Sequence, residues 1–246
     1  ILSDYLAVNF VDRVFNNPTM YTGFENLMAL FTYSLQVYAD FSGYTDIAIG
    51  VAMLMGFYLP VNFNSPYKAK NPGEFWKRWH ISLSNWLKDY LYIPLGGNRK
   101  GKVRTQINLM TTMLVGGLWH GASWNFVIWG GLNGIGMIIA KCWHSLKEKI
   151  GVEGFIQRHK TLMNIDNVLC VLLTFTFITF TRLFFRSSSN LDPATANQVA
   201  WQTAKQMMGQ IFGAWDSSII PLFLLRYGNV VLLFLAGMAI HWLPTK

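Results

Sequence analysis

The sequence has few charged residues and few cysteines, and both shortages narrow the possible kinds of protein. Charged side chains make up 13% of the 246 residues, whereas about 25% is usual in a soluble domain. The two cysteines, Cys142 and Cys170, are far apart and form no CxxC pair. The spacing offers no zinc or haem motif, and we expect no metal site.

Several motifs of well-known enzyme classes are also absent. The chain has no GxxxxGK[ST], no GxGxxG after a strand and no HExxH. It has no GxSxG nucleophile elbow, which disfavours a covalent acyl-enzyme. No internal repeat is visible, which counts against a transporter built from two similar halves.

Apolar residues are abundant: they make up 52% of the chain, and ten residues are tryptophans. Few soluble folds of this size could bury so much apolar surface, so the composition predicts an integral membrane protein. We expect an all-α, polytopic fold with amphipathic or re-entrant helices. The chain begins at Ile1 with no methionine and no signal-peptide pattern, which indicates a piece of a longer protein.

The net charge of +8 would suggest a nucleic-acid partner if the protein were soluble. Here the basic residues lie between apolar segments, the pattern that orients membrane proteins. We therefore expect a lipid bilayer, and no nucleic acid, as the partner.

The first quarter of the chain predicts an amphipathic helix over residues 1–16 and apolar helices over 24–37 and 47–59. The polar stretch 38–46 between them contains Asp40 and Asp46. It is either a loop that joins two spans or a broken helix whose backbone lines a cavity. The second alternative would bring both aspartates to a substrate.

Residues 60–104 form a basic segment with nine Lys or Arg residues between Lys68 and Arg104. By the positive-inside rule this segment is cytoplasmic. Its middle, from Glu74 to Tyr92, predicts one tryptophan-rich amphipathic helix, which Asn71 caps.

Residues 105–141 predict a helical hairpin. The apolar run is interrupted at His120-Gly121, and both of its flanks are basic, so both ends face the cytoplasm. Each arm of about 14–20 residues reaches about 20–30 Å, which places His120 near the deepest point.

The remaining chain predicts a polar connection and two spans. Residues 142–163 are basic and polar, whereas 166–185 and 219–242 are long apolar segments. Residues 190–214 predict an amphipathic or re-entrant helix, with Asp192-Pro193 at its start.

Among the five histidines, His120 alone has apolar sequence on both sides. Such a residue is either a core histidine whose ring nitrogens form hydrogen bonds to a neighbouring helix, or a functional group. Burial disfavours the imidazolium, so His120 could act as the general base for a hydroxyl that attacks an ester or thioester. Backbone N–H groups at Gly116, Gly117 and Gly121 could help the developing oxyanion.

Three stretches resemble a known family. They are residues 72–101 (PGEFWKRWHISLSNWLKDYLYIPLGGNRKG), 116–122 (GGLWHGA) and 38–46 (YADFSGYTD). They are similar to the membrane-bound O-acyltransferases, and within that family to the bacterial branch that O-acetylates alginate. The resemblance implies that 1–246 is the C-terminal part of a single membrane domain, with a tunnel across the bacterial inner membrane.

The resemblance also implies site residues and substrates. His120 matches the catalytic histidine and His80 the second polar position. Both are therefore candidate catalytic residues, with His80 orienting the substrate or assisting proton transfer. The candidate substrate-lining residues are Asp40, Asp46, Asn85, Trp119, Trp124 and Asn125. No bound cofactor is implied: the acyl donor, acetyl-CoA or another acyl thioester, is a co-substrate from the cytoplasmic side. The acceptor is an extracytoplasmic polysaccharide, and an extracytoplasmic O-acetyltransferase is an implied partner.

Other hypotheses stay open at this point. Asp40, Asp46 and His120 could line the pathway of a transporter or channel subunit. The chain could instead transfer D-alanyl groups to teichoic acid, or serve as a scaffold for another transferase.

Overall fold

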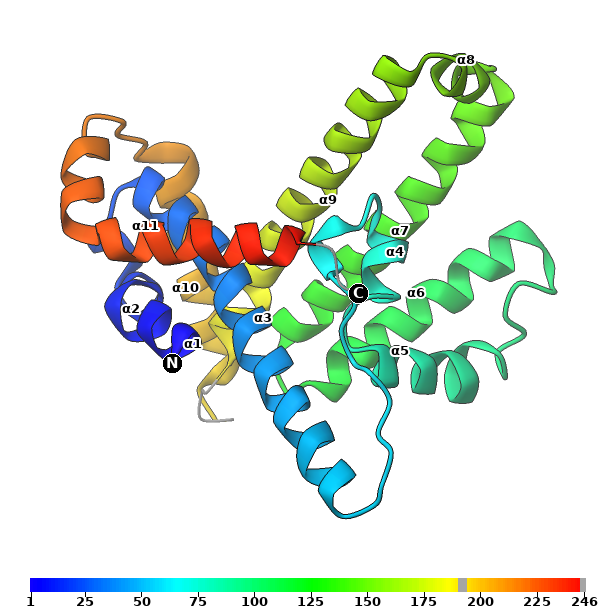
Figure 1. Cartoon of the computed structure of the whole chain (residues 1–246), viewed down its shortest axis with the longest axis horizontal. Coiled ribbons are helices and arrows are strands. Elements are labelled where there is room, and N and C mark those ends of the chain that lie inside the picture. The colour runs from blue at the N-terminus through cyan, green and yellow to red at the C-terminus, as the bar shows by residue number, and fades with distance from the viewer. Residues whose placement is uncertain (190–193, 244–246) are drawn as a thin grey trace. The chain divides into compact units, whose positions relative to one another are not determined.

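A computed structural model describes residues 1–189 and 194–243, and this part of the chain is helical (Figure 1). Its only β-pairing is an isolated antiparallel bridge between Phe63 and Trp79. The all-α prediction is therefore confirmed for these residues. The α-helices in chain order are α1 (Leu2–Leu6), α2 (Asp12–Asn16), α3 (Gly23–Leu54), α4 (Pro72–Trp76), α5 (Ile81–Leu87), α6 (Gly101–Trp119), α7 (Trp124–Lys149), α8 (Val152–Arg158), α9 (Lys160–Ser188), α10 (Ala196–Gly213) and α11 (Ile220–Trp242).

Among the described residues, three helices are long and apolar enough to cross a membrane: α7, α9 and α11. Helix α9 contains the span predicted at 166–185, and α11 matches the span predicted at 219–242 except for its first residue. The expected helical membrane protein is thus confirmed.

The chain divides into two compact units. The first contains the described residues of 1–60, 122–125 and 182–246, and the second contains 61–121 and 126–181. Helices α7 and α9 contribute residues to both.

The core of the first unit joins the N-terminal helices to α3, α10 and α11. The Phe223 ring lies edge-on to Phe10 and Phe24, with centroids 5.5 and 5.2 Å apart. Arg186 donates to the Asp12 carboxylate at 2.7 Å. These aromatic and ionic contacts hold the N-terminal helical segment against the long helices α9 and α11.

Helix α3 runs unbroken through residues 38–46, so both hypotheses for that stretch, a loop and a broken helix, are wrong. The stretch contains no proline, and a single Gly43 costs only about 1 kcal/mol in a helix interior. Thr45 donates its hydroxyl hydrogen to the Ser42 carbonyl. Asp40 and Asp46 are exposed on this continuous helix.

The predicted single helix over 74–92 is also wrong. Asn71 does cap α4, since its side-chain oxygen accepts the Glu74 N–H at 2.8 Å. The helix stops after Trp76, however, and His80 adopts a left-handed backbone (φ 47°) before α5 begins. A π-helical turn, Lys88–Tyr92, then follows α5. Backbone pairing with residues 62–64 redirects the chain here.

Residues 142–163 are helical for most of their length, where a polar connection was predicted. Helix α7 continues to Lys149, and α8 and the start of α9 occupy much of the remainder. Lys147 lies 3.3 Å from both the Glu153 and the Asp166 carboxylate, which ties the three helices together. Residues 190–193, including the predicted Asp192-Pro193 start, lie outside the described residues, and the rest of that amphipathic segment forms α10.

Candidate functional site

The end of α6 and the start of α7 come into backbone contact in the second unit. A Cβ on Gly117 would overlap the Phe126 carbonyl, and a Cβ on Gly130 would overlap the Met113 carbonyl. Glycine at both positions lets the helices approach this closely. The contact fixes the position of His120, which follows the last residue of α6.

His120 lies among aromatic rings. Its centroid is 4.9 Å from that of Trp119 and 5.2 Å from that of Trp129, both edge-on. Its residue neighbour Gly121 has φ 156°, and a Cβ there would lie 2.8 Å from the Phe126 ring. Only glycine leaves room for that ring, so the turn and the aromatic packing support each other.

Burial, and secondarily the charge of His80, lower the pKa of His120 to about 4. The imidazole is therefore neutral near pH 7 and offers a bare ring nitrogen. The backbone around it is less available. Gly121 donates its N–H to the Leu118 carbonyl at 3.3 Å, so this group is already engaged and does not support the predicted oxyanion role.

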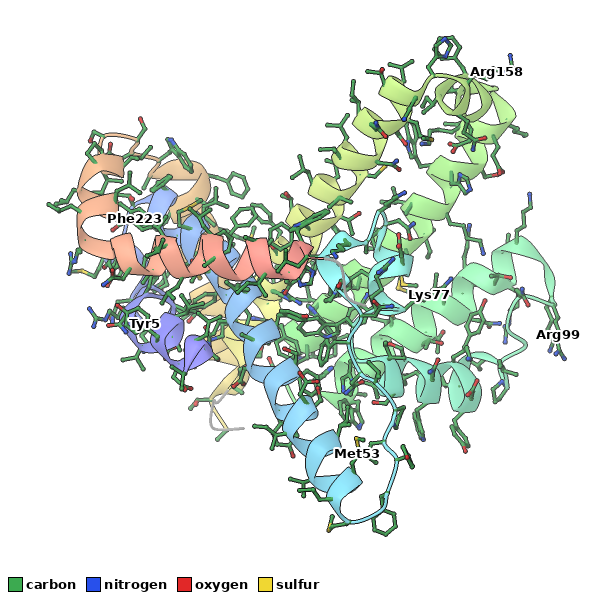
Figure 2. All side chains as sticks on the ribbon, viewed as in Figure 1. Tyr5, Met53, Lys77, Arg99, Arg158 and Phe223 are labelled. Atoms are coloured by element: carbon green, nitrogen blue, oxygen red, sulfur yellow. The ribbon has the colours of Figure 1, made fainter. Side chains whose placement is uncertain are left out.

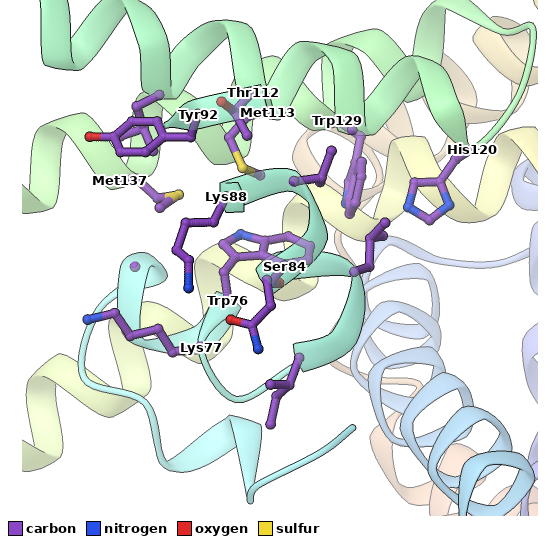
Figure 3. A pocket seen from close by; sticks show the side chains of 17 residues that line it. Trp76, Lys77, Ser84, Lys88, Tyr92, Thr112, Met113, His120, Trp129 and Met137 are labelled. Atoms are coloured by element: carbon purple, nitrogen blue, oxygen red, sulfur yellow. The ribbon is translucent and has the colours of Figure 1, made fainter. Parts of the chain in front are cut away.

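His120 opens onto a pocket of about 340 Å³ (Figure 3). Most of its wall is apolar and includes Trp76, Trp129, Leu109, Met113 and Met137. A site of this kind suits an apolar or weakly polar ligand held in place by a few polar groups.

The polar groups of the pocket include two lysines. In the view of Figure 3, His120 and Trp129 lie towards one side, and Lys77 and Lys88 lie away from them. Lys88 is 3.4 Å from Asp89, whereas no described carboxylate pairs with Lys77. The arrangement can take a ligand with an anionic end and a reactive end near the imidazole.

His80 lies at the left-handed turn between α4 and α5. Its Nδ1 is 3.3 Å from the side-chain oxygen of Asn62, which also accepts the Ser82 N–H at 3.1 Å. Burial lowers the pKa of His80. His80 does not line the pocket, but its charge acts on His120.

The predicted substrate-lining residues are divided between the two units. Asn85 lines the pocket. Trp119 contacts the His120 ring but does not line the pocket. Asp40, Asp46, Trp124 and Asn125 belong to the first unit. There Trp124 donates its N–H to Asn197 at 2.8 Å, and Asn125 donates its N–H to Ser123 at 3.3 Å.

Sequence analysis missed Asn62, Trp129 and the two pocket lysines as members of the site. The sequence marked Lys77 and Lys88 only as part of the basic segment 60–104, which indicates the side of the membrane on which that segment lies. Trp129 lies nine positions after His120 on the next helix, and the interruption at His120-Gly121 was the one signal that the two face each other. Nothing in the sequence links Asn62 to His80.

Among the described residues, no group of three His, Cys, Asp or Glu residues could hold a metal ion.

Comparison with known proteins gives a consistent result. The family model for membrane-bound O-acyltransferases matches residues 1–187. A peptidoglycan O-acetyltransferase of Helicobacter pylori is 43% identical over 79% of this chain and 34% of its own length. A "Probable alginate O-acetylase AlgI" of Pseudomonas aeruginosa is 41% identical over 95% of this chain and 41% of its own length.

A more distant relative is a teichoic acid D-alanyltransferase of Streptococcus thermophilus, 34% identical over 57% of this chain and 34% of its own length. The chain thus spans about two fifths or less of the length of these relatives.

Proposed function

Because the chain belongs to the membrane-bound O-acyltransferase family, we propose that its full-length protein transfers an acyl group, acetyl, from a thioester donor to a polysaccharide hydroxyl. The observation that carries this proposal is a neutral, aromatic-flanked His120 at a largely apolar pocket within the region that the family model matches.

In this proposal His120 is the general base. Its bare ring nitrogen takes the proton of the acceptor hydroxyl as that oxygen attacks the thioester carbonyl. The tetrahedral intermediate then collapses, the carbon–sulfur bond breaks, and the thiolate leaves with the proton from His120. Apolar walls exclude water, which would otherwise hydrolyse the thioester.

The pocket is the donor site in this scheme. Lys77 and Lys88 hold an anionic group of the donor, for instance a phosphate of acetyl-CoA, while the acyl end extends to His120. The basic segment 60–104, which supplies both lysines, supports entry of the donor from the cytoplasmic side. We infer no resident cofactor, because the donor itself carries the acyl group.

The acceptor and the location are inferred from the relatives. Both closer relatives carry names that place an O-acetyl group on a polysaccharide, peptidoglycan in one case and alginate in the other. We propose an extracytoplasmic polysaccharide acceptor, a multi-pass protein of the bacterial inner membrane, and an extracytoplasmic O-acetyltransferase as partner. The three candidate spans support a membrane location.

D-alanyl transfer to teichoic acid is the second candidate, since one relative carries that name. A transporter hypothesis has less support. It requires Asp40, Asp46 and His120 to line one pathway, and the sequence has no internal repeat of the kind on which many transporters are built.

The test is a His120→Ala variant of the full-length protein, expressed in cells whose surface polysaccharide is then analysed for O-acetyl groups by mass spectrometry. We expect loss of acetylation, with the protein still inserted. The matched control is His144→Ala, because His144 is exposed and does not line the pocket. Full acetylation with His120→Ala, or D-alanyl esters in place of acetyl, would overturn the proposal.

A further inference from the structure

We propose that Asn62 is a positioning residue that holds neutral His80 with its hydrogen on Nδ1, so that the lone pair of the ring lies on Nε2. Both readouts of this inference are spectroscopic and independent of the proposed function.

Asn62 is held rigidly beside the His80 turn. The Asn62 carbonyl accepts the Ile81 N–H at 3.0 Å, and the Asn64 N–H donates to the Arg78 carbonyl at 2.9 Å. Between these two bonds, the Phe63 and Trp79 rings lie edge-on, with centroids 5.0 Å apart. The strand-like pairing leaves the buried Asn62 side chain in one place.

The orientation of the Asn62 amide follows from a donor whose hydrogen is fixed. The Ser82 backbone nitrogen lies 3.1 Å from Oδ1 of Asn62. A backbone N–H group can only donate a hydrogen bond and cannot accept one. A flipped amide would place an NH₂ group against that N–H. The oxygen must therefore face Ser82, and the Ser82 hydroxyl donates to the same oxygen at 3.0 Å.

The tautomer of His80 follows from the orientation of the amide. Nδ1 of His80 is 3.3 Å from the same Asn62 oxygen. The Ser82 hydroxyl also lies 3.5 Å from Nδ1, but its hydrogen is directed to the nearer Asn62 oxygen. A bare Nδ1 would therefore face the lone pairs of that oxygen, whereas a protonated Nδ1 donates a hydrogen bond to it. The neutral ring then has its lone pair on Nε2. Free neutral histidine favours the opposite tautomer, so the Asn62 contact changes the chemistry of His80.

The backbone conformation of His80 shows that the surrounding contacts fix the position of this residue. His80 has φ 47°, a left-handed conformation that residues with a Cβ rarely adopt. Such residues persist where surrounding contacts over-determine them, and they are frequent at functional sites. Here Ile81 and Ser82, directly after the turn, are both bonded to Asn62.

The charged groups around His80 define what a pH measurement reports. Arg78 pairs with Glu74 of α4 at 2.8 Å, so the two largely neutralise each other. The other titratable group nearby is His120, whose pKa is lowered in part by the charge of His80. A carboxylate at position 62 would face Nδ1 directly and would favour the imidazolium of His80.

The first experiment is ¹⁵N NMR of the full-length protein labelled at histidine, with His80 signals identified by their loss in a His80→Gln variant. The ring shifts report which nitrogen carries hydrogen. We expect Nδ1–H in the native protein and in Asn62→Asp, and a shift toward Nε2–H in Asn62→Ala. The control is Asn64→Asp, an exposed position in the same segment. Nε2–H in the native protein, or no change in Asn62→Ala, would overturn the inference.

The second experiment is the titration of the His80 ¹⁵N signals against pH. Asn62→Asp raises the pKa of His80, so the midpoint of this titration should move to higher pH by about one unit or more. Asn64→Asp adds the same charge in solvent and should move the midpoint much less. Equal movement in both variants would reduce Asn62 to a structural role. An active His120→Ala protein would instead refute the proposed function, and the tautomer result would stand.

Discussion

The indole of Trp129 stands perpendicular to the imidazole of His120, with an interplanar angle of 86° and centroids 5.2 Å apart. Trp129 is itself buried and lies edge-on to Trp76 at 5.4 Å. Both tryptophans line the same pocket as His120, so the low basicity of His120 depends on this apolar environment.

Replacing Trp129 with alanine should raise the pKa of His120 from about 4 toward the ordinary value near 6.5. Water then reaches the ring, and the charged form is no longer disfavoured. Acyl transfer at pH 5–6 should fall relative to pH 8 in the variant and stay level in the native protein. A pH–rate profile of the full-length protein checks this.

Trp129→Phe serves as the control for that experiment, because it keeps an aromatic wall. Its acid limb should lie between those of the native protein and Trp129→Ala. An unchanged limb in Trp129→Ala would contradict the explanation of the low pKa by burial.

Substitution of Gly117 or Gly130 with alanine should destabilise the protein by about 1–3 kcal/mol, the usual cost of overpacking. The added Cβ would meet a backbone carbonyl, which cannot rotate away. Gly209→Ala in α10 meets nothing within 4 Å and should be neutral or slightly stabilising. Thermal unfolding in detergent compares the three variants, and equal Tm values would contradict the close helix contact.

Lys77→Met should raise the KM for acetyl-CoA by roughly tenfold, the loss of one charge-assisted hydrogen bond in a partly exposed site. With S-acetyl-pantetheine, which carries no phosphate, the KM should not change. Lys100→Met is the control, because Lys100 is exposed and outside the pocket. A similar KM rise for both donors would show that Lys77 shapes the pocket without binding an anion.

Lys147→Met should destabilise the α7–α8–α9 region by about 1–2 kcal/mol, the cost of losing charge-assisted contacts to partly exposed carboxylates. It leaves the Glu153 and Asp166 carboxylates without the cation that lies 3.3 Å from each. Lys149→Met removes the same charge from an exposed position and should have little effect. Hydrogen exchange of α8 distinguishes the two, and equal protection would contradict the prediction.

The location of His120 could be predicted because the signal was local. Glycines and tryptophans around one histidine, within an apolar run, mark a helix end that must pack closely. The three long apolar segments were predictable for the same reason: length and composition decide them with no tertiary information.

The errors came from contacts between distant residues. Asp40 and Asp46 suggested a break, but a helix surface tolerates polar side chains wherever they are exposed, and α3 exposes both. The helix predicted over 74–92 stops because Asn62 pairs with Ser82, twenty positions away. No property of residues 74–92 reports that contact, so pattern and propensity could not find it.

The contact of Gly117 and Gly130 with opposing backbone has a practical consequence for protein engineering. The crossing of α6 and α7 that positions His120 is built from main chain, which substitution cannot reshape without separating the two helices. Farther along the pocket the wall is made of side chains such as Leu109, Met113 and Met137. Redesign toward bulkier acyl groups should therefore shorten those side chains and keep both glycines.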